Sequence, residues 1–335
     1  MTSSLKNKSI LITGGTGSFG ERCIGFLLKK FKPKKIVVFS RDELKQYELS
    51  KKYGEEKYPI RFFIGDVRDK NRLYRACSNI DFIIHAAAMK RVTAAEYNPN
   101  ECIETNVIGA QNLIDAAIDN NVKKVIALST DKAANPVNLY GATKLCSDKL
   151  FVSANNLVGE KKTRFAVVRY GNVISSRGSV IPFFKELINN GIMKLPVTDK
   201  KMTRFVITLE QGVSFVISEL LNFAGGEIFV PKLPSIKIVD LVEAMLKKNQ
   251  YEIIGVRPGE KLHEVMIPKE EARNCIDVGN KYIIVPRLSW WNRKNLDLKI
   301  RKLGKAVPFD FEYVSNNNKS WLSVNQLKKI VNNSD

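Results

Sequence analysis

The stretch that decides the fold is Ile10-Leu11-Ile12-Thr13-Gly14-Gly15-Thr16-Gly17-Ser18-Phe19-Gly20. An apolar, β-branched run leads into a Gly-x-x-Gly-x-x-Gly loop, and a helical pattern follows it. In such a loop Gly14 permits a tight turn, Gly17 lets the backbone approach a pyrophosphate, and Gly20 lets helix and strand pack closely. The order of strand, glycine loop and helix predicts a nucleotide-cofactor site in which the anion faces a helix N-terminus.

Apolar runs alternate with helical patterns through the first half of the chain. The runs are apolar on both faces, as buried parallel strands are. Strands are expected over Ser9–Thr13, Lys35–Ser40, Ile60–Gly65, Asp81–Ala86, Lys123–Ser129 and Phe165–Tyr170. Helices are expected over Phe19–Lys30, Glu43–Lys52, Glu101–Asn120 and Tyr140–Asn156. This alternation predicts an α/β fold with a Rossmann-like, doubly wound parallel sheet.

The regular alternation of strand and helix patterns ends after Gly171, where prolines separate shorter elements. Amphipathic helices are expected over Gln211–Asn222 and Val239–Lys248. The tail from Asn292 to Asp335 is polar, with a turn or loop expected at residues 316–318. We therefore predict a cofactor-binding Rossmann domain over residues 1–170 and a smaller substrate-binding lobe over residues 171–335, partly interleaved with the first.

Composition narrows the class of protein. The 335 residues are 44% apolar and carry a net charge of +20. The basic residues are spread along the chain without a helix-turn-helix, zinc or RNA-binding signature, so an enzyme with an anionic substrate is favoured over a nucleic-acid-binding protein. Five scattered cysteines show no metal or disulfide spacing and indicate a reducing cytoplasm. No run approaches the roughly 20 apolar residues of a membrane span, so no membrane partner is expected.

The ends of the next strands predict the rest of the cofactor site. Ser40 and Arg41, with Lys45 one helical turn on, suit the 2′-phosphate of NADP better than the free ribose of NAD. Asp42 could accept a ribose hydroxyl, but we expect it to cap the following helix. The full set of expected cofactor contacts is Thr13, Gly14, Thr16, Gly17, Ser18, Phe19, Gly20, Ser40, Arg41, Asp42, Lys45, Asp66, Val67, Ala86, Ala87, Ala88, Lys90, Tyr140 and Lys144.

Tyr140 and Lys144 are the first catalytic candidates. Four residues apart on a helix, they share one face, where the ammonium can lower the pKa of the phenol and the phenolate can take a hydroxyl proton as hydride leaves the same carbon. Thr130, Asp131 and Lys132 follow the fifth expected strand and so face the same site. Asp131 and Lys132 form a second acid/base pair that plain alcohol oxidation does not need; in isolation they would be read as a solvated loop pair.

Other chemistries find little support in the sequence. The two histidines, His85 and His263, are too few to predict a zinc site, and no metal is expected. His85 lies in an apolar run and is expected to be a core residue. A serine hydrolase would need a Gly-x-Ser-x-Gly elbow, which the chain lacks.

With these residues in place, the chain resembles the extended short-chain dehydrogenase/reductases that act on nucleotide sugars. The segment Ser129–Pro136 (Ser-Thr-Asp-Lys-Ala-Ala-Asn-Pro), followed by Tyr140 and Lys144, is similar to the short, soluble, configuration-inverting UDP-N-acetylglucosamine 4,6-dehydratases of pseudaminic acid synthesis. So are Ser40–Lys45, Met202–Phe205 and Arg257–Lys261. The resemblance covers about residues 8–270. Membrane-anchored retaining relatives typically carry Met in place of Tyr140.

The resemblance implies a lyase that uses NADP and returns it oxidised. Tyr140, assisted by Lys144, would deprotonate the 4-hydroxyl of the sugar while hydride moves to the cofactor. Lys132 would then remove the proton on carbon 5, and Asp131 would protonate the departing 6-hydroxyl. Return of hydride to carbon 6 and reprotonation of carbon 5 from the opposite face would give a UDP-2-acetamido-2,6-dideoxy-4-hexulose. A lysine base must be neutral part of the time, so Lys132 should be desolvated or close to another cation.

The resemblance also implies the substrate contacts and the assembly. Arg204 and Arg257 suit a diphosphate because their planar forks can bind it bidentately, although a surface ion pair is the alternative for both. A homo-oligomer is implied, with a hexamer as one expected size. The implied substrate contacts are Lys90, Asn172, Val173, Thr198, Met202, Arg204, Arg257 and Glu260.

Three residues depart from the pattern of these dehydratases. Arg91 and Thr93 stand where His and Pro are expected, and Val206 stands where an aromatic residue is expected. Sugar specificity depends on such positions. A UDP-hexose 4-epimerase is the main alternative, since it shares the glycine loop and the Tyr-Lys pair but does not need Asp131 and Lys132. A non-enzymatic NADP-sensing or nucleic-acid-binding protein on this fold is a further one.

Overall fold

The computed structural model describes residues 5–174, 176–286 and 303–332. Its centre is a ten-stranded sheet with the order β16-β14-β15-β10-β6-β5-β4-β1-β2-β3. The six strands of the first half are parallel: β1 (Ser9–Thr13), β2 (Lys35–Ser40), β3 (Ile60–Ile64), β4 (Phe82–His85), β5 (Lys124–Thr130) and β6 (Arg164–Tyr170). The predicted doubly wound α/β sheet is confirmed, with the strand bounds right to within one or two residues.

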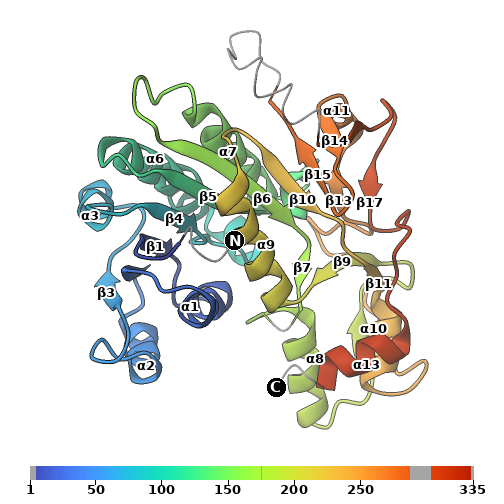
Figure 1. Ribbon diagram of the computed structural model, residues 1–335. Coiled ribbons are helices and arrows are strands. Elements are labelled where there is room, and N and C mark those ends of the chain that lie inside the picture. The colour runs from blue at the N-terminus through green and yellow to red at the C-terminus, as the bar shows by residue number, and fades with distance from the viewer. Residues whose placement is uncertain (1–4, 175, 287–302, 333–335) are drawn as a thin grey trace.

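Helices cover both faces of this sheet (Figure 1). On one face α1 (Ser18–Lys30) packs against α9 (Leu209–Asn222), and on the other α6 (Gly109–Asp119) packs against α3 (Lys70–Ala76) and α7 (Leu139–Ala154). The remaining helices of the first half are α2 (Glu43–Lys52), α4 (Val92–Tyr97) and α5 (Pro99–Ile103). The chain reverses its direction of winding between β1 and β4, and ligands of such sheets bind beyond the strand ends at that point.

The helix predicted over Glu101–Asn120 contains a π-helical turn at Glu104–Ile108, between α5 and α6. The widened turn lets Asn106 reach across to the loop after β4, where its side chain accepts from the N–H of Met89 at 2.8 Å and donates to the carbonyl of Met89 at 3.0 Å. The same amide donates to Thr143 on α7 at 3.0 Å. The π turn therefore ties the β4 loop to the helix that carries Tyr140.

The second half of the chain contributes to the large sheet and also forms smaller ones. In the large sheet β10 (Ile228–Pro231) continues the parallel order next to β6, and β14 (Cys275–Asp277), β15 (Lys281–Ile284) and β16 (Lys305–Ala306) add an antiparallel edge. The small sheets contain β7 (Asn172–Val173), β8 (Leu195–Val197), β9 (Thr203–Ile207), β11 (Ser235–Lys237), β12 (Tyr251–Ile253), β13 (Val265–Ile267) and β17 (Tyr313–Val314). The other helices are α8 (Val180–Asn189), α10 (Ile238–Met245), α11 (Lys269–Ala272) and α13 (Val324–Asn332).

Two buried apolar clusters lie under these elements, one along the large sheet and one among α8, α10, α13 and the small strands. The predicted boundary between residues 170 and 171 stays a prediction. The two amphipathic helices predicted in this half are α9 and α10. The turn or loop predicted at residues 316–318 is confirmed, whereas residues 292–302 and 333–335 of the polar tail lie outside the described residues.

A fully buried arginine links the two halves of the chain. Arg169 on β6 pairs with Glu271 of α11 at 2.6 Å and with Asp148 of α7 at 3.4 Å, and it donates to the carbonyl of Met266 at 2.9 Å. Removing one partner of a buried ion pair leaves an uncompensated charge in a low-dielectric interior.

Arg169→Met should therefore lower the free energy of unfolding by about 3–5 kcal/mol. Arg164→Met on the same strand is the control, because the hydrogen bonds that Arg164 makes within the described part of the chain are to the carbonyls of Lys161 and Thr163; its cost should stay below about 1 kcal/mol. Urea titration measures both, and equal losses would remove the special role of the Arg169 pairs.

Candidate active site

A cavity of about 910 Å³ opens beyond the carboxyl ends of β1, β4 and β5. All the predicted site residues line it except Thr13, Thr198 and Met202. Thr13 is buried and its hydroxyl lies 2.7 Å from Nδ1 of His85, which makes His85 the core residue that was expected. Met202 is packed in the apolar cluster beside α10, and Thr198 lies behind Glu260, to which it donates at 3.2 Å.

The glycine loop forms one end of the cavity. Gly14 has a φ of +65°, and a Cβ there would lie 2.8 Å from the backbone nitrogen of Ala87. Gly17 is the N-cap of α1 without a side-chain cap, so the first N–H groups of the helix remain available to an anion. Thr16 and Ser40 join the loop to the end of β2 through hydroxyls 2.7 Å apart. The cradle has the shape and the donors that a dinucleotide pyrophosphate requires.

The end of β2 carries the residues expected to choose between NADP and NAD. Asp42 caps α2, accepting from the N–H of Lys45 at 2.9 Å, which confirms the expected cap. The side-chain hydrogen bond from Lys45 also lowers the pKa of Asp42. Arg41 reaches Asp66 at 3.5 Å and is largely exposed on the cavity rim. The guanidinium of Arg41 is thus within reach of a cofactor in the cavity, whereas the carboxylate of Asp42 already accepts a hydrogen bond from Lys45.

Tyr140 and Lys144 lie in the first turns of α7. Asn138 caps this helix, accepting from the N–H of Gly141 at 2.8 Å. Burial lowers the pKa of Lys144, opposed by the charge of Asp148. Burial likewise raises the pKa of Tyr140 to about 12, and Lys132 is the cation that works against this rise. Desolvation outweighs the neighbouring charges and sets the direction of the net shift, so the lowering of the phenol pKa by Lys144 stays a prediction.

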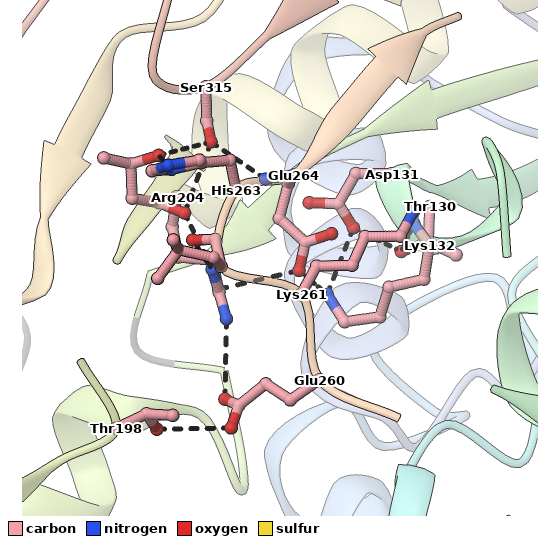
Figure 2. A network of polar contacts seen from close by, with 12 residues as sticks. Thr130, Asp131, Lys132, Thr198, Arg204, Glu260, Lys261, His263, Glu264 and Ser315 are labelled. Carbon is pink, nitrogen blue, oxygen red and sulfur yellow. Dashed lines mark hydrogen bonds and ion pairs between the residues drawn. The ribbon is translucent and has the colours of Figure 1, made fainter. Parts of the chain in front are cut away.

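Lys132 lies between two buried carboxylates (Figure 2). Thr130 ends β5, and Asp131 and Lys132 begin a 3₁₀ turn, Asp131–Ala133. Nζ of Lys132 is 3.2 Å from Oδ1 of Asp131 and 3.1 Å from Oε1 of Glu264, which precedes β13. Oδ1 of Asp131 also accepts from the Thr130 hydroxyl at 2.9 Å. The acid/base pair predicted from the sequence is therefore a triad that Glu264 completes.

These three groups shift one another's protonation. Burial raises the pKa of Asp131, and the charge of Glu264 adds to the rise. Burial alone would lower the pKa of Lys132, but the two carboxylates outweigh it and raise the pKa. The expected desolvation of Lys132 is present, and Arg204 is a cation that favours its neutral form, yet the two carboxylates keep it charged at rest.

Arg204 connects this triad to the outer end of the cavity. Its guanidinium lies 3.5 Å from Glu264 and 3.4 Å from Glu260, and it donates to the carbonyl of Thr203 at 2.7 Å. Arg204 is buried, so the alternative of a surface ion pair does not describe it, whereas Arg257 is exposed on the rim. The cavity thus extends from the glycine loop to Arg204 and Arg257. Tyr140 with Lys144, and Asp131 with Lys132, line the part between.

Sequence reasoning missed Glu264 and Asn106. Glu264 is the seventh residue after Arg257, in the same segment as Glu260, but its partner Lys132 is far away along the chain and no local spacing links them. Within the described residues, no cluster of three or more His, Cys, Asp or Glu side chains could hold a metal ion. Across the same part of the chain, every helix is too short or too polar to cross a membrane.

Close packing at Gly141 fixes the triad. A Cβ at Gly141 would lie 2.3 Å from the carbonyl oxygen of Lys132, so the 3₁₀ turn can rest on α7 only if residue 141 has no side chain.

Gly141→Ala should cost about 1–3 kcal/mol of unfolding free energy and displace Lys132. Gly54→Ala is the control, since its Cβ meets the nearest atom at 3.7 Å. Comparable thermal denaturation of the two variants would contradict this account.

Comparisons with known proteins agree with this geometry. Residues 10–286 match the family model described as "Polysaccharide biosynthesis protein". The chain is 55% identical over 331 residues to the UDP-N-acetylglucosamine 4,6-dehydratase (inverting) of Campylobacter jejuni, covering 98% of each chain. It is 39% identical over 340 residues to a UDP-glucose 4-epimerase of Rickettsia bellii, covering 98% of this chain and 96% of the relative.

A solved structure, Pen from Bacillus thuringiensis, superimposes with a TM-score of 0.87 at 38% identity, covering 98% of this chain and 99% of that one. Together with the family model and the high identity over nearly the whole length, this similarity leads to one conclusion. The chain belongs to the polysaccharide biosynthesis protein family, alongside the inverting UDP-N-acetylglucosamine 4,6-dehydratases.

Proposed function

We propose that this protein removes water across carbons 5 and 6 of UDP-N-acetylglucosamine and inverts carbon 5, giving UDP-2-acetamido-2,6-dideoxy-β-L-arabino-hex-4-ulose. The observation that carries the proposal is the placement of Asp131 and Lys132 in the same cavity as Tyr140 and Lys144. The similarity to the Campylobacter jejuni enzyme supports it. Two acid/base sets fit a reaction that needs both an alcohol oxidation and an elimination.

The first set serves the oxidation. The cradle around Gly14 and the free N-terminus of α1 fit a nicotinamide dinucleotide, which when bound supplies a hydride acceptor that later returns the hydride. Tyr140 takes the proton of the 4-hydroxyl, and the neighbouring Thr130 hydroxyl works against the rise in the pKa of its phenol. Lys144, buried one turn along α7, stabilises the phenolate through its charge.

The second set serves the elimination. A proton shift from Nζ of Lys132 to the carboxylate of Asp131, across 3.2 Å, creates a neutral amine and a carboxylic acid without changing the charge of the site. The amine removes the proton on carbon 5, made acidic by the 4-ketone, and the acid protonates the departing 6-hydroxyl. Protonation of carbon 5 from the opposite face inverts that centre.

The outer residues hold the nucleotide part of the substrate. Arg204 and Arg257 would bind the diphosphate, with Glu260 and Thr198 placing Arg204. Lys90, Asn172 and Val173 line the cavity and would contact the sugar; Met202 would act only through packing. Arg91 and Thr93 also line the cavity, so we expect two of the three departures to affect the sugar specificity.

The proposal also covers the cellular compartment, the assembly of the protein and the pathway that uses its product. All five cysteines are free, as in a reducing cytoplasm, and we expect a homo-oligomer, with a hexamer as one expected size. No nucleic-acid or membrane partner is needed for the reaction. The product would enter pseudaminic acid synthesis and flagellin glycosylation.

A UDP-hexose 4-epimerase is the second candidate, favoured by the similarity to the Rickettsia bellii protein. An epimerase would use the cradle and Tyr140 but leave Asp131 and Lys132 without a role. Incubation with UDP-N-acetylglucosamine, followed by mass spectrometry and NMR, separates the two. A keto product lighter by one water supports the dehydratase, and an isomer of unchanged mass contradicts it.

Lys132→Ala should abolish exchange of the carbon-5 proton with deuterated solvent, because the amine that removes it is gone. Turnover should fall by roughly 100- to 10,000-fold. NADP binding should be unchanged, since Lys132 lies apart from the glycine loop. NMR of the recovered sugar nucleotide measures the exchange, and undiminished exchange would show that Lys132 is not the base.

Arg41→Ala should weaken the binding of NADP more than that of NAD, because only NADP carries a 2′-phosphate for the guanidinium. We expect a change of about tenfold or more in the ratio of the two dissociation constants. Arg22→Ala, which removes an exposed pair with Glu210 outside the cavity, is the control. Equal losses for both cofactors would contradict the preference for NADP.

A further inference from the structure

Glu264 is held rigidly at the wall of the cavity. Its N–H donates to the hydroxyl of Ser315 at 2.9 Å, and its carbonyl accepts from the N–H of Ser315 at 2.8 Å. It leads into β13, which pairs with β17, so its backbone belongs to the body of the protein. The side chain is buried and reaches inward to Lys132 (Figure 2).

Two buried carboxylate oxygens of the triad lack hydrogen-bond partners among the described residues: Oε2 of Glu264 and Oδ2 of Asp131. Burying a polar atom without a partner costs free energy, so each such atom needs an explanation. A structural ion pair would gain from satisfying both oxygens of each carboxylate. Both oxygens are therefore available to accept a proton.

The two carboxylates differ in the charges that face them. Glu264 faces Lys132, Arg204 and Lys261, and these cations outweigh burial and lower its pKa. Asp131 gains less from its neighbours, so burial and the charge of Glu264 raise its pKa. Tyr140 of α7 is a further titratable group at the triad, and it interacts with both Lys132 and Asp131. When Lys132 gives up a proton, two acceptors at almost equal distance compete for it, and their surroundings decide between them.

We propose that Glu264 is a positioning residue: it holds Lys132 against Asp131 and stays ionised throughout the reaction, so that the proton leaving Lys132 moves to Asp131 and makes it the acid. This inference rests on the proposed function. The proton moves from Nζ to a carboxylate oxygen of Asp131, Lys132 becomes neutral, and the charge of Glu264 is unchanged. Arg204, anchored to the carbonyls of Thr203 and Leu262, keeps Glu264 in its charged form.

Glu264→Gln is the direct test in the full-length protein with NADP bound. The change removes a negative charge beside both Lys132 and Asp131, so the pKa of each falls. Both limbs of the pH profile of kcat should therefore move to lower pH. We expect kcat to fall by about 10- to 100-fold, less than for loss of the acid or base itself, while KM changes by less than about threefold.

Two further variants separate this role from a structural one. Glu264→Asp keeps the charge and should leave the limbs of the pH profile in place even where kcat falls. Glu260→Gln also removes a carboxylate from Arg204 but does not touch Lys132, so it should raise KM without moving the limbs. Unmoved limbs in a folded Glu264→Gln protein, or equal shifts in all three variants, would overturn the inference.

A measurement that needs no turnover keeps the inference separate from the proposed function. Carboxyl carbons labelled with ¹³C and followed by NMR should show Asp131 taking up its proton at higher pH than Glu264, with signals assigned from Asp131→Asn and Glu264→Gln. The reverse order would overturn the inference whatever the enzyme makes. A correct order together with no loss of water from UDP-N-acetylglucosamine would instead contradict the proposed function alone.

Discussion

The ammonium of Lys132, held between two buried carboxylates at the end of β5, is the interaction on which the rest of the site depends. Desolvation raises the free energy of a buried ammonium and of a buried carboxylate. Each of these groups stays charged only because groups of opposite charge are near. That balance lets a single proton shift turn an ion pair into an acid and a base. We propose that Asp131 and Lys132 therefore act as acid and base, which a solvated loop pair could not do.

The fold brings the parts of this triad together from distant places in the chain. The parallel sheet delivers Thr130, Asp131 and Lys132 to its carboxyl edge, and α7 packs against the backbone of Lys132 at Gly141. The second half supplies Glu264 and Arg204, and Arg169 fixes that half to α7 through Asp148 and Glu271. The nicotinamide end and the acid/base end of the cavity therefore share one rigid frame.

Much of this frame could be predicted from local patterns. The buried strands are apolar on both faces, and the glycine loop and the Asp42 cap depend on neighbouring residues, so their signals lie within a few positions. The partners of distant residues could not be predicted: Glu264 finds Lys132, and Asn106 finds Met89, only after folding. The burial that raises the pKa of Tyr140 could not be predicted either, because spacing shows a nearby cation but not the desolvation of the phenol. The place of Met202 in a core likewise depends on tertiary packing.

Whether the hydride site and the Asp131–Lys132 pair act on one sugar ring is tested most directly with UDP-N-acetylglucosamine carrying deuterium at carbon 4, incubated in ordinary water. The account predicts a dehydrated product in which the deuterium has moved to the carbon-6 methyl group. Deuterium that remains at carbon 4 of an undehydrated sugar would contradict it, as would deuterium lost to the solvent.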